Sequence, residues 1–372
     1  MDVEATGELG AVAVDGLDAG GAVIATGASP PFPIYPADTR VAIYMAIPNS
    51  IGAAPVTLPA ARDQLGVAAL PYGAVIAGGR EPSGIPSDAV SVYNAYDHSL
   101  AAGVAMPGPR AGLGVAVGFG RYVYLFGGRD PSGSATGTMW RLDTQTAPSG
   151  AIVEFGNTAF PRADQSIVPI GDDRFIITGV PGLELSATTN NVIERRDAAA
   201  LPSSAAAVSA SSGSSVAIFV GSQAVFRFRD NSFEVIEVPG AKRDGANVVG
   251  LPNGQVAIVC GDGDAIRLDP VTGISEAFSI PTARRTGCAM AATPRHLVIA
   301  GGTMIGTGAI ATTAEIYDAT TLALVTTVPL TVPRTGALAT ALPNDQILIS
   351  SGLDDRGAPT AILELFTPGP PD

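Results

Sequence analysis

Arginine is the most regularly spaced residue type in this sequence among those that could do chemistry. One arginine stands 16 or 17 residues before each of six pairs formed by a small residue and a glycine. These arginines are Arg62, Arg110, Arg162, Arg243, Arg284 or Arg285, and Arg334. Arg80 and Arg129 each directly follow a Gly-Gly pair. Because guanidinium groups donate charge-assisted, often bidentate hydrogen bonds to carboxylates, the pattern predicts a site for an acidic partner.

Residue types for catalysis or metal binding are scarce. The chain has two histidines, His98 and His296, which we expect to be ordinary surface residues. Asp262-Gly263-Asp264 lacks the further acidic ligands of a cation site and is typical of a hairpin turn. The GxSxG, HExxH, Walker-loop and EF-hand patterns are absent from the sequence. We therefore predict no catalytic residue, no metal and no cofactor.

Composition and charge narrow the classes of fold and partner. The net charge of −13 repels nucleic acid phosphates, so we expect no nucleic acid partner. No window of the sequence holds eighteen uninterrupted apolar residues, so we expect no membrane span. The 45 glycines and 30 prolines favour many short strands joined by tight turns. Two cysteines, Cys260 and Cys288, make no disulfide framework for a chain this long. Because packed sheets lie about 10 Å apart, we expect two free thiols.

An apolar run that ends in a small residue and a glycine recurs eight times along the chain. The copies end at Gly27, Gly79, Gly128, Gly179, Gly221, Gly261, Gly302 and Gly352. This period is typical of propeller blades, each made of four antiparallel strands, here called a to d. We predict an all-β fold, a single propeller domain of eight blades, with seven as the alternative. The predicted repeats are 7–59, 60–107, 108–157, 158–201, 202–239, 240–281, 282–331 and 332–366.

Two of the units resemble kelch repeats, which carry a Gly-Gly pair at the end of the second strand and often an arginine before the first. One unit has Arg110, Gly127-Gly128 and Trp140, and the other has Arg284-Arg285, Gly301-Gly302 and Tyr317. The resemblance implies a propeller. Kelch-type copper oxidases need two clustered copper-binding histidines, which the separate His98 and His296 do not provide. A kelch-type sugar isomerase that uses glutamate and arginine stays open.

Alternation of strand direction sorts the loops onto two faces. The d-to-a and b-to-c connections emerge on one face, here called the top, and this face receives the arginines at 62, 80, 110, 129, 162, 243, 285 and 334. The alternative role for each arginine is to bond backbone carbonyls of the adjacent blade and position its loop. Phe32 and Tyr35 in the loop 28–38 add a rigid aromatic contact surface. The b-to-c connections at Ser222-Gln223 and Asp262-Gly263 are short, so we expect a gap in the top rim there.

Two hypotheses for function follow from these features. The first is a non-catalytic binding or scaffold propeller that engages a protein or a glycan on its arginine-lined top face. The second is a carbohydrate-active enzyme that uses arginine, glutamate and tyrosine at the channel mouth. A buried carboxylate within reach of two arginines in a pocket would favour the enzyme. We expect an exported protein whose leader is absent from the sequence, with a cytoplasmic location as the alternative.

The ends of the chain must close the ring, because an open propeller exposes strand edges. Residues 361–366 have the register of a strand c, and the proline-rich residues 367–372 do not supply a strand d. We predict that residues 2–5 pair antiparallel with residues 361–366 and complete the last blade.

Overall fold

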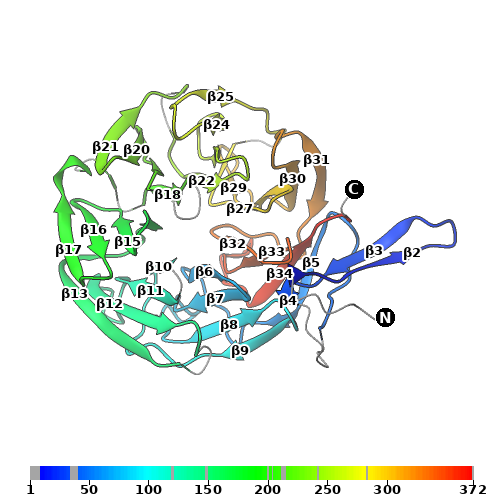
Figure 1. Ribbon diagram of the computed structural model, residues 1–372, viewed down its shortest axis with the longest axis horizontal. Helices are drawn as coiled ribbons and strands as arrows, with labels where there is room; N and C mark the ends of the chain where they lie inside the picture. The colour runs from blue at the N-terminus through cyan, green and yellow to red at the C-terminus, as the bar shows by residue number, and fades with distance from the viewer. Residues whose placement is uncertain are drawn as a thin grey trace.

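A ring of sheets around a central channel forms most of the chain in the computed structural model (Figure 1). The structure describes residues 9–33, 41–118, 121–146, 150–198, 201–202, 204–210, 215–240, 243–281 and 284–370. Within these residues, seven sheets have four antiparallel strands each. The predicted all-β propeller is therefore confirmed, with seven blades, the alternative count, rather than eight.

The blades follow one another around the ring in chain order, and each runs from its innermost strand to its outermost strand. Blade 1 consists of β6 (Gly66–Leu70), β7 (Gly73–Ala77), β8 (Val90–Asn94) and β9 (Ser99–Ala102). Blade 2 consists of β10 (Gly114–Val117), β11 (Tyr122–Phe126), β12 (Thr136–Asp143) and β13 (Ile152–Arg162). Blade 3 consists of β14 (Ile167–Pro169), β15 (Arg174–Ile177), β16 (Gly182–Ser186) and β17 (Asn191–Arg195). Blades 4 and 5 are β18 (Ala206–Ser209), β19 (Ala217–Val220), β20 (Val225–Arg229), β21 (Ser232–Ile236); and β22 (Ala246–Gly250), β23 (Val256–Cys260), β24 (Ile266–Leu268), β25 (Ser275–Ala277). Blades 6 and 7 are β27 (Ala289–Ala292), β28 (His296–Ala300), β30 (Thr313–Asp318), β31 (Leu324–Pro329); and β32 (Leu338–Ala341), β33 (Ile347–Ser350), β34 (Ile362–Thr367), β5 (Ser50–Thr57).

The core lies between the faces of neighbouring blades. The second strand of every blade is almost wholly buried, as in β7, whose five residues are all buried. Val75 of blade 1 and Leu125 and Trp140 of blade 2, for example, belong to one hydrophobic cluster. A strand covered on both faces needs a continuous apolar run, which explains the recurring runs in the sequence. The short 3-10 helix η1 (Arg196–Ala198) follows blade 3.

The ring closes non-covalently in blade 7, as expected, but with a different segment. Strand β34 pairs antiparallel with β5, in the register Phe366 with Ile51 and Thr367 with Ser50. The prediction that residues 2–5 supply this strand is thus wrong, since β5 occupies the outer edge of β34; residues 2–5 themselves lie outside the described residues. Residues 50–57 give a longer ladder than four residues could.

The first predicted repeat, 7–59, is not a blade. Its strands β2 (Ala13–Leu17) and β3 (Val23–Ala28) form a separate hairpin that projects from the ring in Figure 1. Strands β1 (Leu9–Gly10) and β4 (Phe32–Pro33) form a second two-stranded pair. A side chain at Gly27 would collide with the carbonyl of Tyr44. This glycine therefore permits a close backbone crossing and does not end a blade strand.

Candidate functional site

Six of the predicted site arginines are buried at the top of the ring, before strand a of blades 1, 2, 3, 5, 6 and 7. These rim arginines are Arg62, Arg110, Arg162, Arg243, Arg285 and Arg334, with exposed fractions of 1% to 8%. Most bond carbonyls at the top of their own blade. Arg162, for example, donates from Nη1 to the Thr178 carbonyl at 2.9 Å and from Nη2 to the Pro181 carbonyl at 3.0 Å. Burial lowers the pKa of Arg162 to about 10, which still leaves it charged at neutral pH.

The same backbone turn follows each rim arginine. The residue two positions later has a positive φ in all six blades: Gln64 (52°), Gly112 (64°), Asp164 (58°), Gly245 (69°), Gly287 (65°) and Gly336 (67°). This left-handed turn directs the chain into strand a, and four of the arginines, Arg62, Arg162, Arg243 and Arg334, bond carbonyls of the b-to-c connection beside it. The rim arginines thus position their loops as the alternative reading predicted, but through their own blade rather than the adjacent one.

Three exposed arginines of the top face are paired with aspartates. Arg80 Nη2 lies 2.6 Å from Asp63 Oδ2, and Arg129 Nη2 lies 3.0 Å from Asp164 Oδ2. Arg284, with 57% of its side chain exposed, lies 2.6 Å from Asp264. Three exposed guanidinium groups of the predicted arginine-lined face therefore already have a carboxylate partner within the chain.

Two cavities lie at the short b-to-c connections, where a gap in the rim was predicted. The blade 5 cavity, of about 280 Å³, is lined by Val259, Cys260, Gly261, Gly263, Asp264, Ala265, Ala277, Phe278, Ser279, Ile280, Arg284 and Arg285. The blade 4 cavity, of about 300 Å³, is lined by Gln223, Ala224, Val225, Val235, Ile236, Glu237, Val238, Gly240 and Arg243. Both combine a short turn, the end of strand d and a rim arginine, so they occupy equivalent positions in successive blades.

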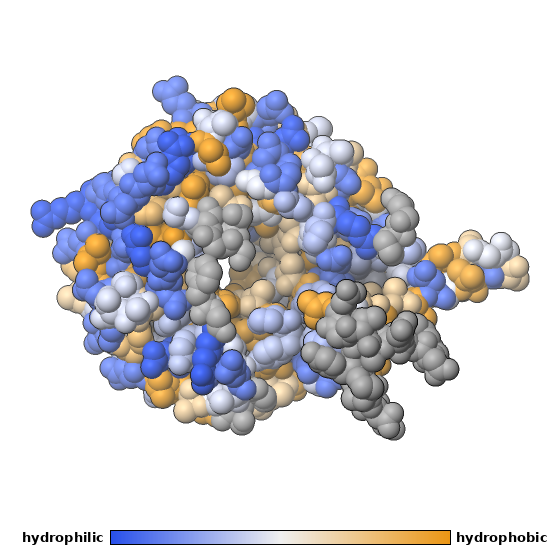
Figure 2. All heavy atoms as spheres, in the orientation of Figure 1, coloured by the Kyte–Doolittle hydropathy of each residue, from blue (hydrophilic) through white to orange (hydrophobic). Residues whose placement is uncertain are grey.

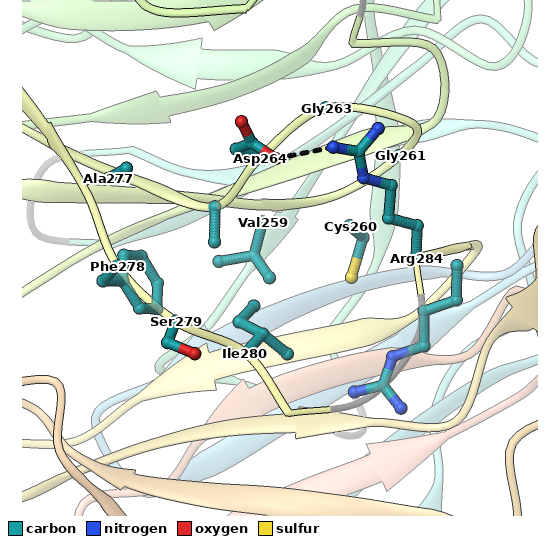
Figure 3. A pocket seen from close by; sticks show the side chains of 12 residues that line it. Val259, Cys260, Gly261, Gly263, Asp264, Ala277, Phe278, Ser279, Ile280 and Arg284 are labelled. Carbon is teal, nitrogen blue, oxygen red and sulfur yellow. Dashed lines mark hydrogen bonds and ion pairs between the residues drawn. The ribbon is translucent and has the colours of Figure 1, made fainter.

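The blade 5 cavity joins apolar and charged side chains. Figure 3 shows Val259, Phe278 and Ile280 together, and the ion pair between Arg284 and Asp264 beside them. Arg284 also donates from Nη1 to the Asp262 carbonyl at 2.5 Å. The Asp262-Gly263-Asp264 turn is therefore held by an arginine, and the described residues contain no cluster of acidic, histidine or cysteine side chains suited to a metal.

Arg285 differs from the other rim arginines. Its Nη2 donates to Glu315 Oε2 in a pair whose side chains are 3% and 0% exposed, and its buried Nη1 has no hydrogen-bond partner among the described residues. Glu315 Oε1 and the Tyr317 hydroxyl are likewise buried without a partner in the described part of the chain. Three unpartnered polar atoms thus lie around one rim arginine.

The two cysteines form a disulfide beside this cavity, so the prediction of free thiols is wrong. Cys260 ends strand β23 of blade 5 and Cys288 precedes strand β27 of blade 6, with 6.6 Å between their Cα atoms. The spacing of about 10 Å applies to sheets packed face to face. Inner strands of neighbouring blades approach more closely near the channel, within the range that disulfides span.

The remaining predicted residues are spread over the molecule. Phe32 is half-buried in the pair β1–β4, and Tyr35 lies outside the described residues. The histidines are buried rather than on the surface, at 5% and 8% exposed. His98 Nδ1 lies 2.7 Å from the Tyr93 hydroxyl, and His296 packs edge-on against Phe366.

A buried carboxylate within reach of two arginines exists, but away from the described cavities. Glu184 bonds Arg174 at 2.7 Å and Arg195 at 2.8 Å, and it lines neither of the two rim cavities. Glu315 contacts one arginine. The arrangement sought for an enzyme is therefore not met at the rim gap. Sequence reasoning missed Glu315 and Phe278, because neither stands in a motif. Their positions within the repeat can be recognised only when the sequences of the blades are aligned with one another.

Comparisons with known proteins support the propeller fold. No protein-family model matches the chain, and no curated protein matches it either. The chain is similar to a solved structure titled "Structure of YjhT", with a TM-score of 0.53 and 15% sequence identity. The similarity covers 83% of this chain and 96% of that chain. The described residues contain no helix long and apolar enough to cross a membrane.

Proposed function

We propose that the protein is a non-catalytic binding propeller that engages a partner, a protein or a glycan, at the gap in its top rim. The observation that carries the proposal is the pair of adjacent cavities over blades 4 and 5, at their short b-to-c connections, residues 221–224 and 261–265. Concave sites with an apolar lining and a few placed polar groups are typical of ligand binding. Figure 2 also shows an opening at the centre of the ring with apolar spheres on its wall.

Two further assignments belong to this proposal. The blades are of the kelch type, which is supported by Gly-Gly pairs that both adopt positive φ, as at Gly78 (62°) and Gly79 (101°). The protein is exported, which is supported by the disulfide between Cys260 and Cys288, because disulfides persist in oxidising compartments.

The test uses two arginines that are similarly exposed but lie on opposite faces. Arg284 is at the top gap, and Arg121 lies at the a-to-b turn below, where it pairs with Asp143 and is 46% exposed. The labelled protein is applied to a displayed library of random twelve-residue peptides and to a glycan array. We expect specific hits that Arg284→Glu weakens at least about tenfold and Arg121→Glu leaves unchanged. Absence of hits on both probes, or equal weakening by both variants, would contradict a top-face binding function.

A further inference from the structure

The rim arginines of blades 6 and 7 provide an internal comparison. Arg334 of blade 7 pairs with Glu364 at 2.6 Å, as Arg285 pairs with Glu315, with the same separation of 30 residues. Arg334 Nη1 also donates to the carbonyls of Ser351 at 3.1 Å and Ile362 at 2.8 Å. The blade 7 pair is therefore completed by peptide groups of the chain itself.

In blade 6 the corresponding donor is open. Arg285 Nη1 has no partner among the described residues, although a buried donor without an acceptor is costly. Other rim arginines have such acceptors, as Arg62 does at the Gly78 carbonyl at 2.5 Å and the Ala89 carbonyl at 3.0 Å. Arg285 also lines the blade 5 cavity, together with Phe278. The residue that carries the open donor thus also lines the cavity.

The acceptor that fits Arg285 Nη1 is a neutral one. Glu315 already neutralises the guanidinium inside a buried pair, so a second carboxylate would be desolvated there without a free counter-charge. A carbonyl oxygen satisfies the same donor in blades 1 and 7. The lining around it offers apolar surface from Val259, Phe278 and Ile280. This combination matches a backbone carbonyl next to an apolar side chain.

The neighbouring strand edge suits an extended chain. Strand β25 (Ser275–Ala277) is the outermost strand of blade 5 and continues into Phe278 and Ser279 at the cavity. Its outer backbone groups are not paired with another strand among the described residues. Extended peptides commonly add to such edges through main-chain hydrogen bonds, with side chains in adjacent pockets. From these observations we infer that the blade 5 cavity binds an extended peptide segment of a protein partner, with a backbone carbonyl on Arg285 Nη1 and an apolar side chain against Phe278. This inference rests on the proposed function and names the partner class for the same site.

The first test blocks the cavity. Ser279 is exposed at the edge of the blade 5 cavity, and Glu237 occupies the equivalent position in the blade 4 cavity. The two residues are 42 positions apart in the sequence, which is also the separation between the rim arginines Arg243 and Arg285 of these cavities. Peptides selected from the displayed random library are measured against Ser279→Trp and the matched control Glu237→Trp. We expect at least about a tenfold rise in Kd for Ser279→Trp and less than about a twofold change for Glu237→Trp, because Arg285 lines only the first cavity, and Arg243 Nη1 in the second is already bonded to the Asp264 carbonyl.

The second test removes the donor without leaving a buried charge alone. Arg285→Met combined with Glu315→Leu should weaken the selected peptides at least about tenfold, while Arg334→Met with Glu364→Leu should leave their affinity unchanged. Circular dichroism and thermal melting of both double variants establish that they are folded. Peptides that bind wild type and Ser279→Trp equally, yet lose affinity with Arg284→Glu, would overturn the cavity assignment and preserve the top-face function. Specific hits on the glycan array alone would overturn the peptide assignment.

Discussion

Replacing Arg334 by methionine should destabilise the ring through the charge that it leaves behind. Arg334 is 1% exposed and Glu364, its ion-pair partner, is 0% exposed, so Arg334→Met leaves a carboxylate buried in blade 7 without its counter-charge. Breaking a buried ion pair from one side costs about 3 to 5 kcal/mol. The loss falls on the blade that closes the ring by pairing β34 with β5.

The expected shift in melting temperature follows from chain length. An unfolding entropy of about 2.1 cal/mol/K per residue gives about 0.8 kcal/mol/K for 372 residues that unfold together. A loss of about 3 to 5 kcal/mol then lowers Tm by about 4 to 6 °C. Differential scanning calorimetry of wild type and Arg334→Met measures this directly.

Two control variants separate burial from charge. Arg129→Met removes one side of an ion pair whose side chains are 47% and 45% exposed, and such exposed pairs contribute about 0 to 1 kcal/mol, so its Tm should fall by about 1 °C or less. Arg334→Met with Glu364→Leu should recover much of the loss, since no charge stays buried alone. If Arg334→Met melts within about 1 °C of wild type, the structural role assigned to the rim arginines is refuted.

Three further outcomes are expected. Cys260→Ala with Cys288→Ala should lower the free energy of unfolding by about 3 to 4 kcal/mol, since the disulfide closes a loop with a sequence separation of 28. Equal urea midpoints for this variant and wild type would contradict the predicted loss. Burial lowers the pKa of His98 and His296 below the ordinary value of about 6.5. The unfolded chain therefore binds more protons than the folded one, so the stability should fall as pH drops through that value. Replacing both histidines by glutamine should flatten the profile of Tm against pH between pH 7.5 and 5.5. Deleting residues 17–22, the exposed end of the hairpin, should leave the near-ultraviolet circular dichroism of the ring unchanged, and loss of that signal would show that this end supports the blades.

The architecture could be predicted from the sequence because each blade repeats one physical requirement. A strand packed on both faces needs an apolar run, and the turn after it needs residues that accept positive φ, so runs ending near Gly79, Gly128 and Gly302 mark blades directly. The count failed at Gly27, where the same residue types serve the crossing over Tyr44. Local pattern does not distinguish these two uses of glycine, because the difference lies in a contact between segments.

The disulfide and the closing strand depend on distances that the repeat period leaves unspecified. Cys260 and Cys288 are 28 residues apart in sequence, but their approach is set by how closely inner strands of two blades converge. Residues 50–57 were read as part of a first blade, and only the position of β34 beside them reveals that they complete the last one. The short b-to-c connections of blades 4 and 5 could be read from the sequence and lie beside the two cavities, but the equally short connection of blade 3, residues 178–181, was not recognised.

The periodically spaced arginines differ in their hydrogen-bond partners from blade to blade. Arg62, Arg162 and Arg334 recur at one position of the repeat and bond the same kind of carbonyl. Regular spacing therefore indicated structure more than binding. Arg285 stands at the same position of the repeat, but its Nη1 has no partner in the described part of the chain and the residue lines a cavity. In a repeat protein, the blade that departs from the shared bonding pattern is the place to seek a ligand.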